Sequence, residues 1–287
     1  MELKKIGFIG LGEVGRIFSR EMKAKGADVY YFDVITKEAE DWIQFLPIKK
    51  LIETCEILLS TVSTHKAVEV ARTAAMYLDS NKTYSDMNST SASAKKQIAR
   101  IIETSRADFI EGAILSAVGE TGPKASILVS GEKAETFSRL MNHLGLVNLR
   151  FFSTQIGDSS LVKMIRSVFS KGVECLLLEM LIAGKRAGLA DHLWKDIVDF
   201  MTKNPFDRVA ENWIKTHPLA SERRYHEMLQ VIETLEEIDV TPVMTRGTKD
   251  FFERSVAMEL GKRFEHKPDD FWDVVHCMEK ELKMKGV

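Results

Sequence analysis

The stretch FIGLGEVG, residues 8–15, places a glycine-rich turn between an apolar run and an amphipathic helix that extends to about residue 25. A dinucleotide's pyrophosphate requires this order of strand, tight turn and helix. Gly10 can adopt the turn, Gly12 leaves the backbone open to the phosphates, and Gly15 allows helix and strand to pack closely. The N-terminus of the helix then faces the phosphate charge. The sequence therefore predicts a nucleotide-binding βα unit.

An acidic residue at the end of the next predicted strand supports this interpretation, because glycine turns also occur in βα units that bind no ligand. Residues 28–33, DVYYFD, end in Asp33, about 20 residues beyond the glycines, where a carboxylate hydrogen-bonds a ribose hydroxyl. We expect NAD to be preferred over NADP, because Asp33 would repel a 2′-phosphate and Val34 stands where an arginine usually accommodates one. Lys37 lies nearby, so NADP is the second possibility.

Length and composition are those of a globular protein with two ordinary domains. The 287 residues are 45% hydrophobic and 29% charged, with a formal net charge of −2, which gives no bias toward nucleic acid or anionic membranes. Cys55, Cys175 and Cys277 are widely spaced, so neither disulfides nor a metal site are expected. We also expect no signal peptide and no membrane span, because the apolar runs are short or interrupted by charge, and predict a cytoplasmic protein.

Strand-like and helix-like segments alternate over the first half of the chain. The predicted strands are residues 28–33, 56–62, 83–86, 107–115, 126–129 and 147–152, and the predicted helices are residues 48–55, 65–78, 91–105 and 133–144. This alternation is typical of a doubly wound, mostly parallel sheet, whereas helical periodicity alone continues from Gly157 nearly to the end. We therefore predict an α/β Rossmann domain over residues 1–155 and an all-α domain over residues 156–287.

The helix predicted to begin near Asp158 carries apolar residues around most of its circumference, which predicts burial on nearly every side. Lys163, Arg166, Ser167 and Ser170 form one polar stripe at i, i+3, i+4 and i+7. Because a buried cation is costly unless it is paired or used, we expect this stripe to face the cleft between the domains. The alternative is that Lys163 merely extends its amine to solvent or pairs with a carboxylate.

Prolines punctuate the remaining helical sequence. Asn204-Pro205 and His217-Pro218 predict helix breaks, and Thr241-Pro242 predicts a turn. Residues 220–237 are predicted to form a helix whose charged start, with Arg223, is either a solvated face or part of a site.

With both domains laid out, the chain resembles the β-hydroxyacid dehydrogenase superfamily, which includes 3-hydroxyisobutyrate and 6-phosphogluconate dehydrogenases. Residues 8–15 are similar to its nucleotide fingerprint, residues 85–90 (SDMNST) to its segment beside the nicotinamide, and residues 111–122 occupy the place of its substrate-binding loop. Residues 163–167 (KMIRS) are similar to its catalytic helix motif. The chain looks most like a branch that has a phosphogluconate-dehydrogenase-like NAD-binding C-terminal domain and mostly unassigned substrates.

Two positions depart from the family pattern. Leu115-Ser116-Ala117 stands where the family usually carries Ser-Gly-Gly, and Ser167 replaces the expected asparagine. By this resemblance Lys163 is the acid/base group, with Ser167 beside it, and we expect Arg166 and Ser116 to hold an anionic substrate, with Arg223 as a weaker candidate. The residues expected to bind the cofactor are Gly10, Leu11, Gly12, Glu13, Val14, Gly15, Asp33, Val62, Ser89 and Thr90.

The resemblance implies an NAD(P)-dependent oxidoreductase that transfers hydride between the nicotinamide and a small anionic β-hydroxy acid, and a homodimer formed through the helical domain. One alternative is reduction of a C=N bond, as in the superfamily's imine reductases, which commonly lack the lysine that Lys163 supplies here. The other is a non-catalytic dinucleotide-binding module that recognises a partner through its helical domain; an extra reader domain or a basic tail would favour it, and the sequence has neither.

Overall fold

The structure, a computed structural model, describes residues 4–35 and 41–284, so Lys37 lies outside the described residues. The chain divides into two compact units, Met1–Val168 and Phe169–Val287. The first unit carries the sheet and the second is helical, which confirms the predicted fold class. The division falls inside a long helix, α7 (Asp158–Arg186), and the domain boundary expected at residues 155/156 stays a prediction.

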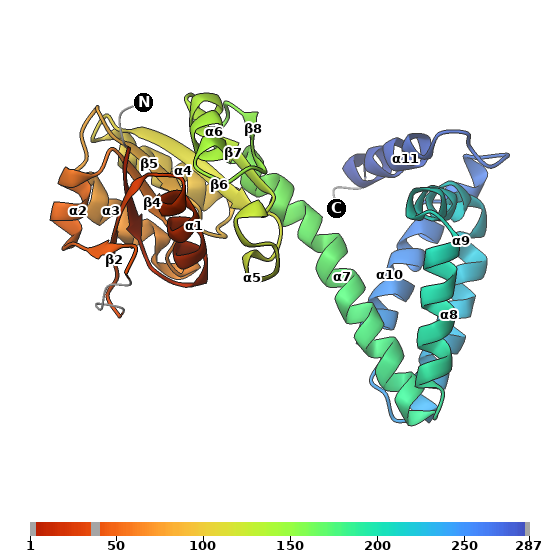
Figure 1. Cartoon of the computed structure of the whole chain (residues 1–287). Helices are drawn as coiled ribbons and strands as arrows, with labels where there is room; N and C mark the ends of the chain where they lie inside the picture. The colour runs from red at the N-terminus through yellow and green to blue at the C-terminus, as the bar shows by residue number, and fades with distance from the viewer. Residues whose placement is uncertain (1–3, 36–40, 285–287) are drawn as a thin grey trace. The chain divides into compact units, whose positions relative to one another are not determined.

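The first unit is built on an eight-stranded sheet (Figure 1). Its strands are β1 (Lys5–Ile9), β2 (Asp28–Phe32), β3 (Gln44–Phe45), β4 (Ile57–Ser60), β5 (Thr83–Asp86), β6 (Asp108–Ile114), β7 (Ile127–Ser130) and β8 (Leu149–Ser153). Their order is β3-β2-β1-β4-β5-β6-β7-β8, and every pair is parallel except β6 with β7. The chain reverses its direction of winding between β1 and β4, and open parallel sheets bind ligands at such a switch point.

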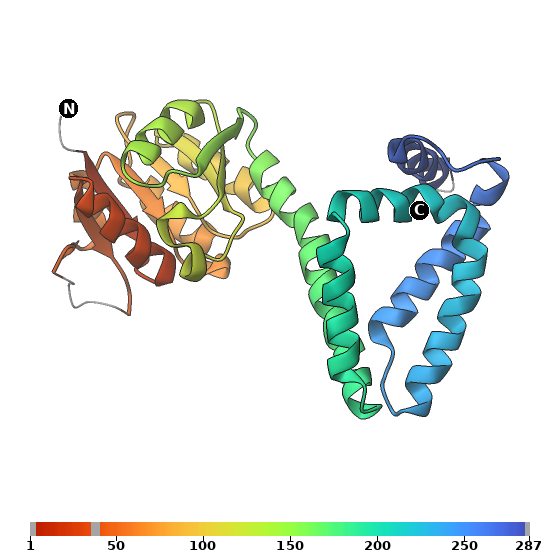
Figure 2. The same cartoon turned by 45° about the vertical axis from the view of Figure 1, so that its right-hand side comes forward.

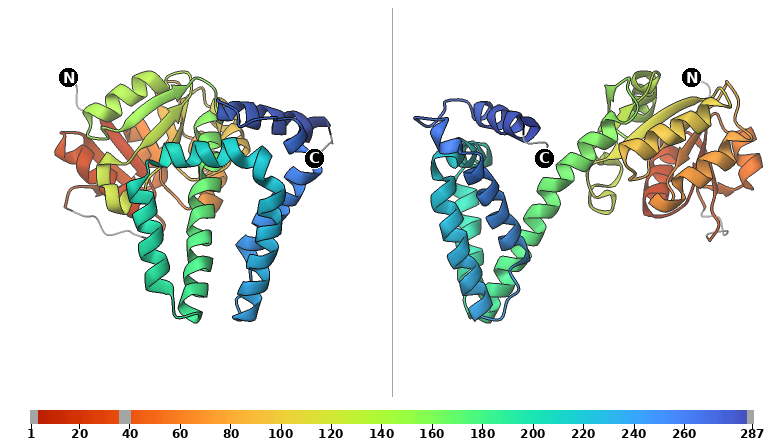
Figure 3. Two further views of the ribbon diagram at one scale, coloured as in Figure 1. Left: turned by 90° about the vertical axis from the view of Figure 1, so that its right-hand side faces the viewer. Right: turned by 180° about the vertical axis from the view of Figure 1, so that it is seen from behind.

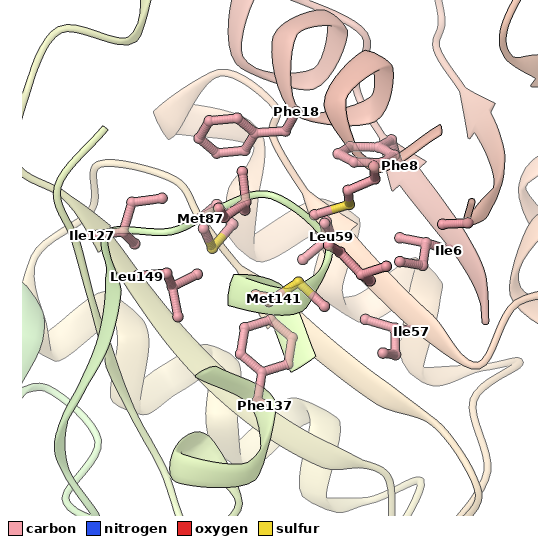
Figure 4. Packing of buried hydrophobic residues seen from close by; sticks show 14 of the residues in the cluster. Ile6, Phe8, Phe18, Ile57, Leu59, Met87, Ile127, Phe137, Met141 and Leu149 are labelled. Carbon is pink, nitrogen blue, oxygen red and sulfur yellow. The ribbon is translucent and has the colours of Figure 1, made fainter. Parts of the chain in front are cut away.

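Successive side chains of a strand point to opposite faces of the sheet, so both faces can carry apolar side chains. Helices cover both faces. Ile6 and Phe8 of β1 join one core cluster, and Ile9 joins the other. Helices α1 (Glu13–Ala24) and α6 (Ala134–His143) pack on the first face, as the side chains in Figure 4 show. The second face carries α2 (Ile48–Thr54), α3 (Ala67–Ala75) and α4 (Ala92–Glu103). The short helix α5 (Val118–Thr121) and strand β3 were not predicted from the sequence.

The second unit consists of most of α7 with α8 (Ala190–Lys203), α9 (Phe206–Glu237), α10 (Val243–Ala257) and α11 (Phe271–Met284). The predicted break at Asn204-Pro205 separates α8 from α9. The predicted break at His217-Pro218 is wrong, because Pro218 lies buried inside α9. Proline removes one helical hydrogen bond without ending the helix, and Figure 2 shows α9 changing direction along its length. Helix α10 packs along α9 (Figure 3).

The apolar surface of α7 is less buried than the sequence predicted. Large side chains at i, i+4, i+7, i+8, i+12 and i+15 remain exposed within the single chain, and Val168 is 77% exposed. We call this set the α7 stripe: Leu161, Ile165, Val168, Phe169, Val173 and Leu176. The prediction of burial on nearly every side is therefore wrong for the isolated chain, because composition does not reveal which chain would cover the helix.

Over the described residues, no helix is long and apolar enough to cross a membrane, and no group of three or more His, Cys, Asp and Glu side chains is arranged to hold a metal ion.

Candidate active site

The glycine turn joins β1 to α1 and each of its glycines has a geometric reason. Gly10 has φ +96°, and a Cβ there would lie 2.7 Å from the Thr61 carbonyl oxygen. A Cβ on Gly15 would lie 2.5 Å from the Gly10 carbonyl oxygen. At Gly12, by contrast, a Cβ would meet no atom within 4 Å, so this position opens onto free space at the start of α1. A phosphate approaching the helix N-terminus fits that space.

The carboxylate of Asp33 lies beside this turn. Its two oxygens accept hydrogen bonds from the backbone N–H groups of Leu11 and Ile35, each at 2.7 Å. Val62 also borders the turn, because its Cγ1 would lie 2.9 Å from a Cβ on Gly10. The residues around the turn therefore fit a dinucleotide: an open glycine backbone, a helix N-terminus and a carboxylate that can accept from a ribose hydroxyl.

The remaining cofactor-site candidates differ in exposure. Leu11 is buried, Val14 is partly buried against the core, and Glu13 is exposed at the start of α1. The Glu13 carboxylate lies against Gly119 of α5, where a Cβ would come within 2.4 Å of Oε1. Beyond β5, Thr90 is buried.

Lys163 lies in the second turn of α7, in the same compact unit as the glycine turn, and its Nζ donates a hydrogen bond to Ser89 Oγ. Ser89 is exposed in the loop that follows β5, and the carboxyl ends of parallel strands face the nucleotide site in this fold. Partial burial lowers the pKa of the Lys163 ammonium, and the nearby positive charge of Lys95 lowers it further. Both effects disfavour the charged ammonium, which is the direction expected of a lysine that accepts a proton.

Arg166 lies one turn farther along α7 and donates from Nη1 to the Leu115 carbonyl oxygen at 2.9 Å. The Ser116 hydroxyl stabilises its own loop, since it accepts from Ser126 N at 2.9 Å and lies 3.3 Å from Thr121 Oγ1. Ser167 donates to the Lys163 carbonyl oxygen at 2.9 Å, within the helix. The structure thus brings Lys163 and Arg166 to the loops after β5 and β6.

Arg223 has different surroundings. It lies on α9, is exposed, and forms an ion pair with Glu227 four residues on. Because it belongs to the second compact unit, its contribution to a substrate site stays a prediction.

A buried charged network lies next to the site, and the sequence interpretation missed it. Lys95 of α4 and Asp86 of β5 form an ion pair of 2.9 Å with both side chains fully buried. Glu111 of β6, paired in register with Asp86, is also fully buried and accepts from the backbone N–H groups of Gly157 and Ser160. The available signal was Lys95 itself, which stands in the inward stripe of α4 with Ile98 and Ile102.

Residues 5–148 match the family described as the NAD binding domain of 6-phosphogluconate dehydrogenase. The chain belongs to this family. Residues 185–255 match a domain of unknown function, DUF1932. The resemblance drawn from the sequence is thereby confirmed, as is NAD as the class of cofactor that the first unit is built to bind.

Similar proteins extend over nearly the whole chain. An uncharacterized 28.5 kDa protein of Methanothermus fervidus is 25% identical over 254 residues, which cover 86% of this chain and 97% of that protein. A conserved protein of unknown function, whose structure is described as similar to 3-hydroxyacid dehydrogenases, is 28% identical with a TM-score of 0.59 and covers 88% of this chain and 96% of its own.

A variant of the imine reductase from Myxococcus stipitatus, solved in complex with NAD⁺, has a TM-score of 0.78 at 14% identity and covers 96% of this chain and 99% of its own. Identity this low shows a common fold alone. The family and fold are those of NAD(P)-dependent oxidoreductases, and neither identifies the substrate.

Proposed function

We propose that this chain is an NAD(P)-dependent dehydrogenase that transfers hydride between the nicotinamide and a small anionic β-hydroxy acid, with Lys163 as the general acid/base. The observation that carries the proposal is the hydrogen bond from Lys163 Nζ to Ser89 Oγ beside the sheet that bears the glycine turn. Oxidation of an alcohol needs one group to take the hydroxyl proton, and the lowered pKa of Lys163 favours that role.

The cofactor, when bound, supplies the hydride acceptor or donor. Lys163 Nζ takes the hydroxyl proton during oxidation and returns it during reduction, while Ser89 orients the amine. Arg166 uses Nη1 on the Leu115 carbonyl and keeps further N–H groups with which a guanidinium binds a carboxylate or phosphate. Ser116 is the second group proposed to bind the anion. The Ser167 oxygen can still accept a hydrogen bond and is proposed to orient the substrate hydroxyl.

The second candidate function is reduction of a C=N bond. Its support is the shared fold of the imine reductase from Myxococcus stipitatus, together with the departures at Ser167 and residues 115–117 from the hydroxy-acid pattern. The proposed role of Lys163 weighs against it, because imine reductases commonly lack this lysine.

A substrate panel separates these candidates. C3 to C6 hydroxy acids with and without phosphate, matched neutral alcohols and cyclic imines are tested with both cofactors while NADH or NADPH absorbance is followed. We expect saturable oxidation of an acid, a higher KM for that acid in Arg166→Ala, and no such change for a neutral alcohol. Turnover of imines alone would assign the chain to C=N reduction. No turnover of any compound, with cofactor still bound, would assign it to the non-catalytic class.

We further propose that the chain forms a homodimer through its helical domain, residues 156–287, and acts in the cytoplasm. Support for the dimer comes from the α7 stripe, since a row of large exposed apolar side chains on one side of a helix is typical of an interface. The cysteines, all free thiols, are compatible with a reducing compartment.

A further inference from the structure

A fully buried lysine lies next to the loop that carries Ser89. Lys95 has no exposed surface, and its inward neighbours on α4 are the apolar Ile98 and Ile102. Replacing a buried ion pair with apolar side chains of similar volume is often neutral or stabilising, so stability alone does not explain a lysine here. Its contacts suggest a different reason.

The ammonium group of Lys95 meets three acceptors. Nζ forms the ion pair with Asp86 Oδ2 at 2.9 Å and donates to the Asp86 carbonyl at 2.7 Å and to the Gly112 carbonyl at 3.0 Å. An ammonium has three donors and no acceptor, so this set of partners matches the charged form. Burial lowers the pKa of Lys95 overall, and the carboxylates of Asp86 and Glu111 offset only part of this lowering.

One path leads from Lys95 to Ser89. The Asp86 carboxylate also accepts from the side-chain amide of Asn88, which donates in turn to Ser60 Oγ at 3.0 Å. Asn88 directly precedes Ser89, whose hydroxyl accepts from Lys163. Lys95 therefore helps to fix the loop that presents Ser89.

A second path leads to the backbone of α7. Gly112, whose carbonyl Lys95 binds, follows Glu111, and the Glu111 carboxylate accepts from Gly157 N and from Ser160 N, the latter at 2.6 Å. Gly157 directly precedes α7, and Ser160 lies in its first turn, about one turn before Lys163. Both segments that Lys95 binds thus lead to the Lys163 side chain, one through Ser89 and the other through the helix.

Charges around Lys163 come from several elements. Lys95 of α4 acts on it as a like charge. The carboxylates of Asp86 in β5 and Glu111 in β6 are engaged by Lys95 and by the amides of α7 respectively, and Arg166 of α7 donates to the Leu115 carbonyl.

We propose that Lys95 is a positioning residue for Lys163: it fixes the loop that presents Ser89 and keeps a positive charge within electrostatic range of the Lys163 amine. The proposal rests on the acid/base role proposed for Lys163. Lys163 is expected to lose its proton at lower pH than an exposed lysine, chiefly because it is partly buried, and the consequence of the proposal is that the Lys95 charge contributes part of this difference.

Competitive acetylation measures this without a substrate. The full-length protein is treated with trace acetic anhydride over a pH series, and the labelling of individual lysines is read by peptide mass spectrometry. In the wild type, Lys163 is expected to label with a midpoint at lower pH than Lys133, an exposed lysine paired with Asp108. In Lys95→Met, the Lys163 midpoint is expected to move to higher pH. The matched control, Lys133→Met, breaks an exposed lysine–aspartate pair and should leave the Lys163 midpoint unchanged.

Lys95→Gln removes the charge but keeps donors for Asp86 and Gly112, so it replaces Lys95→Met if the methionine variant fails to fold. The proposal is wrong if Lys163 and Lys133 share one midpoint in the wild type, or if a folded Lys95 variant retains the wild-type midpoint of Lys163. A shifted midpoint combined with no turnover in the substrate panel would support the positioning role and reject the dehydrogenase.

Discussion

Lys163 combines a hydrogen bond to Ser89 with a lowered pKa, and its removal tests the proposed chemistry directly. General acid/base catalysis contributes about 10² to 10⁴ in rate, so Lys163→Met should lower kcat by that order and leave NAD affinity nearly unchanged. Lys171→Met, which removes an exposed lysine of the same helix, is the control and should retain kcat. A Lys163 variant with near wild-type kcat would mean that the lysine is not the acid/base group.

The pH dependence of the same reaction follows from the direction of the pKa shift. Oxidation needs the neutral amine, so its kcat should rise as pH rises through the pKa of Lys163, below the 10.5 of an ordinary lysine. Reduction needs the ammonium, so its kcat should fall over the same range. Profiles of kcat against pH in both directions measure this, and in Lys163→Met both the rise for oxidation and the fall for reduction should disappear.

Two glycines of the turn should respond differently to alanine. At Gly12 a Cβ meets no protein atom, so Gly12→Ala should cost at most about 1 kcal/mol of stability yet weaken NAD binding, because the methyl group occupies the space offered to phosphate. At Gly15 a Cβ would press on the Gly10 carbonyl, and overpacking costs about 1–3 kcal/mol. Urea unfolding and NADH titration separate the two effects. If Gly12→Ala and Gly15→Ala lost the same NADH affinity and did not differ in stability, the separate roles assigned to the two glycines would be wrong.

Cofactor preference is expected to follow Asp33. Its carboxylate lies beside the turn, bonded to Leu11 N and Ile35 N, where it would repel a 2′-phosphate. We expect kcat/KM to be higher with NAD than with NADP, and Asp33→Ser to reduce that ratio. A wild-type preference for NADP would show that Lys37 outweighs Asp33.

The site was predictable from the sequence where one local segment carries the information. The glycine roles and the position of Asp33 follow from spacing along the continuous segment β1, α1 and β2, and the geometry at Gly10, Gly12 and Gly15 fits those expected roles. The Lys95 network was not predictable in this way. It joins α4, β5, β6 and the start of α7, and only the register of β5 with β6 places Asp86 opposite Glu111.

At the level of elements, Glu179 of α7 caps another helix. Its carboxylate accepts from Met244 N, Thr245 N and the Thr245 hydroxyl at the start of α10, where Pro242 offers no side-chain cap. Glu179→Ala should therefore cost about 1–3 kcal/mol in urea unfolding, because orphaned helix amides lose a charged acceptor. Glu174→Ala, at an exposed ion pair, should change stability by no more than about 0.5 kcal/mol.

Acid should remove this contribution. Partial burial raises the pKa of Glu179, but the bonds from Thr245 and the α10 amides lower it more, so the pKa lies below 4.5. A carboxylate with a lowered folded pKa stabilises above its unfolded pKa and loses that effect as pH falls through the folded value. The stability gap between wild type and Glu179→Ala should accordingly shrink below pH 4.5. A gap that persisted in acid would assign the effect to packing.

Helices and strands were predictable wherever periodicity extends over several residues, as in the segments from β4 to β8. The error at Pro218 has a physical origin, since local sequence shows that a helical hydrogen bond is lost but not that burial of the proline will hold the helix together. Strand β3 has two residues, too few for any alternation to be visible.

At the scale of the whole molecule, the α7 stripe is a row of large apolar side chains that one chain leaves exposed. Composition predicted a helix buried on nearly every side, which the exposed stripe contradicts, because the partner that would cover it is not encoded in any local pattern.

The proposed dimer makes a direct prediction at this stripe. Val168 is 77% exposed, and glutamate is a good helix former, so Val168→Glu should leave the folded chain intact while placing a charge in the interface. Sedimentation equilibrium should give twice the chain mass for the wild type and the single-chain mass for the variant at the same concentration. Val147→Glu, at an exposed valine outside α7, is the control and should remain dimeric. A wild-type monomer would reject the dimer, and a variant that stays dimeric while keeping its unfolding midpoint would move the interface away from α7.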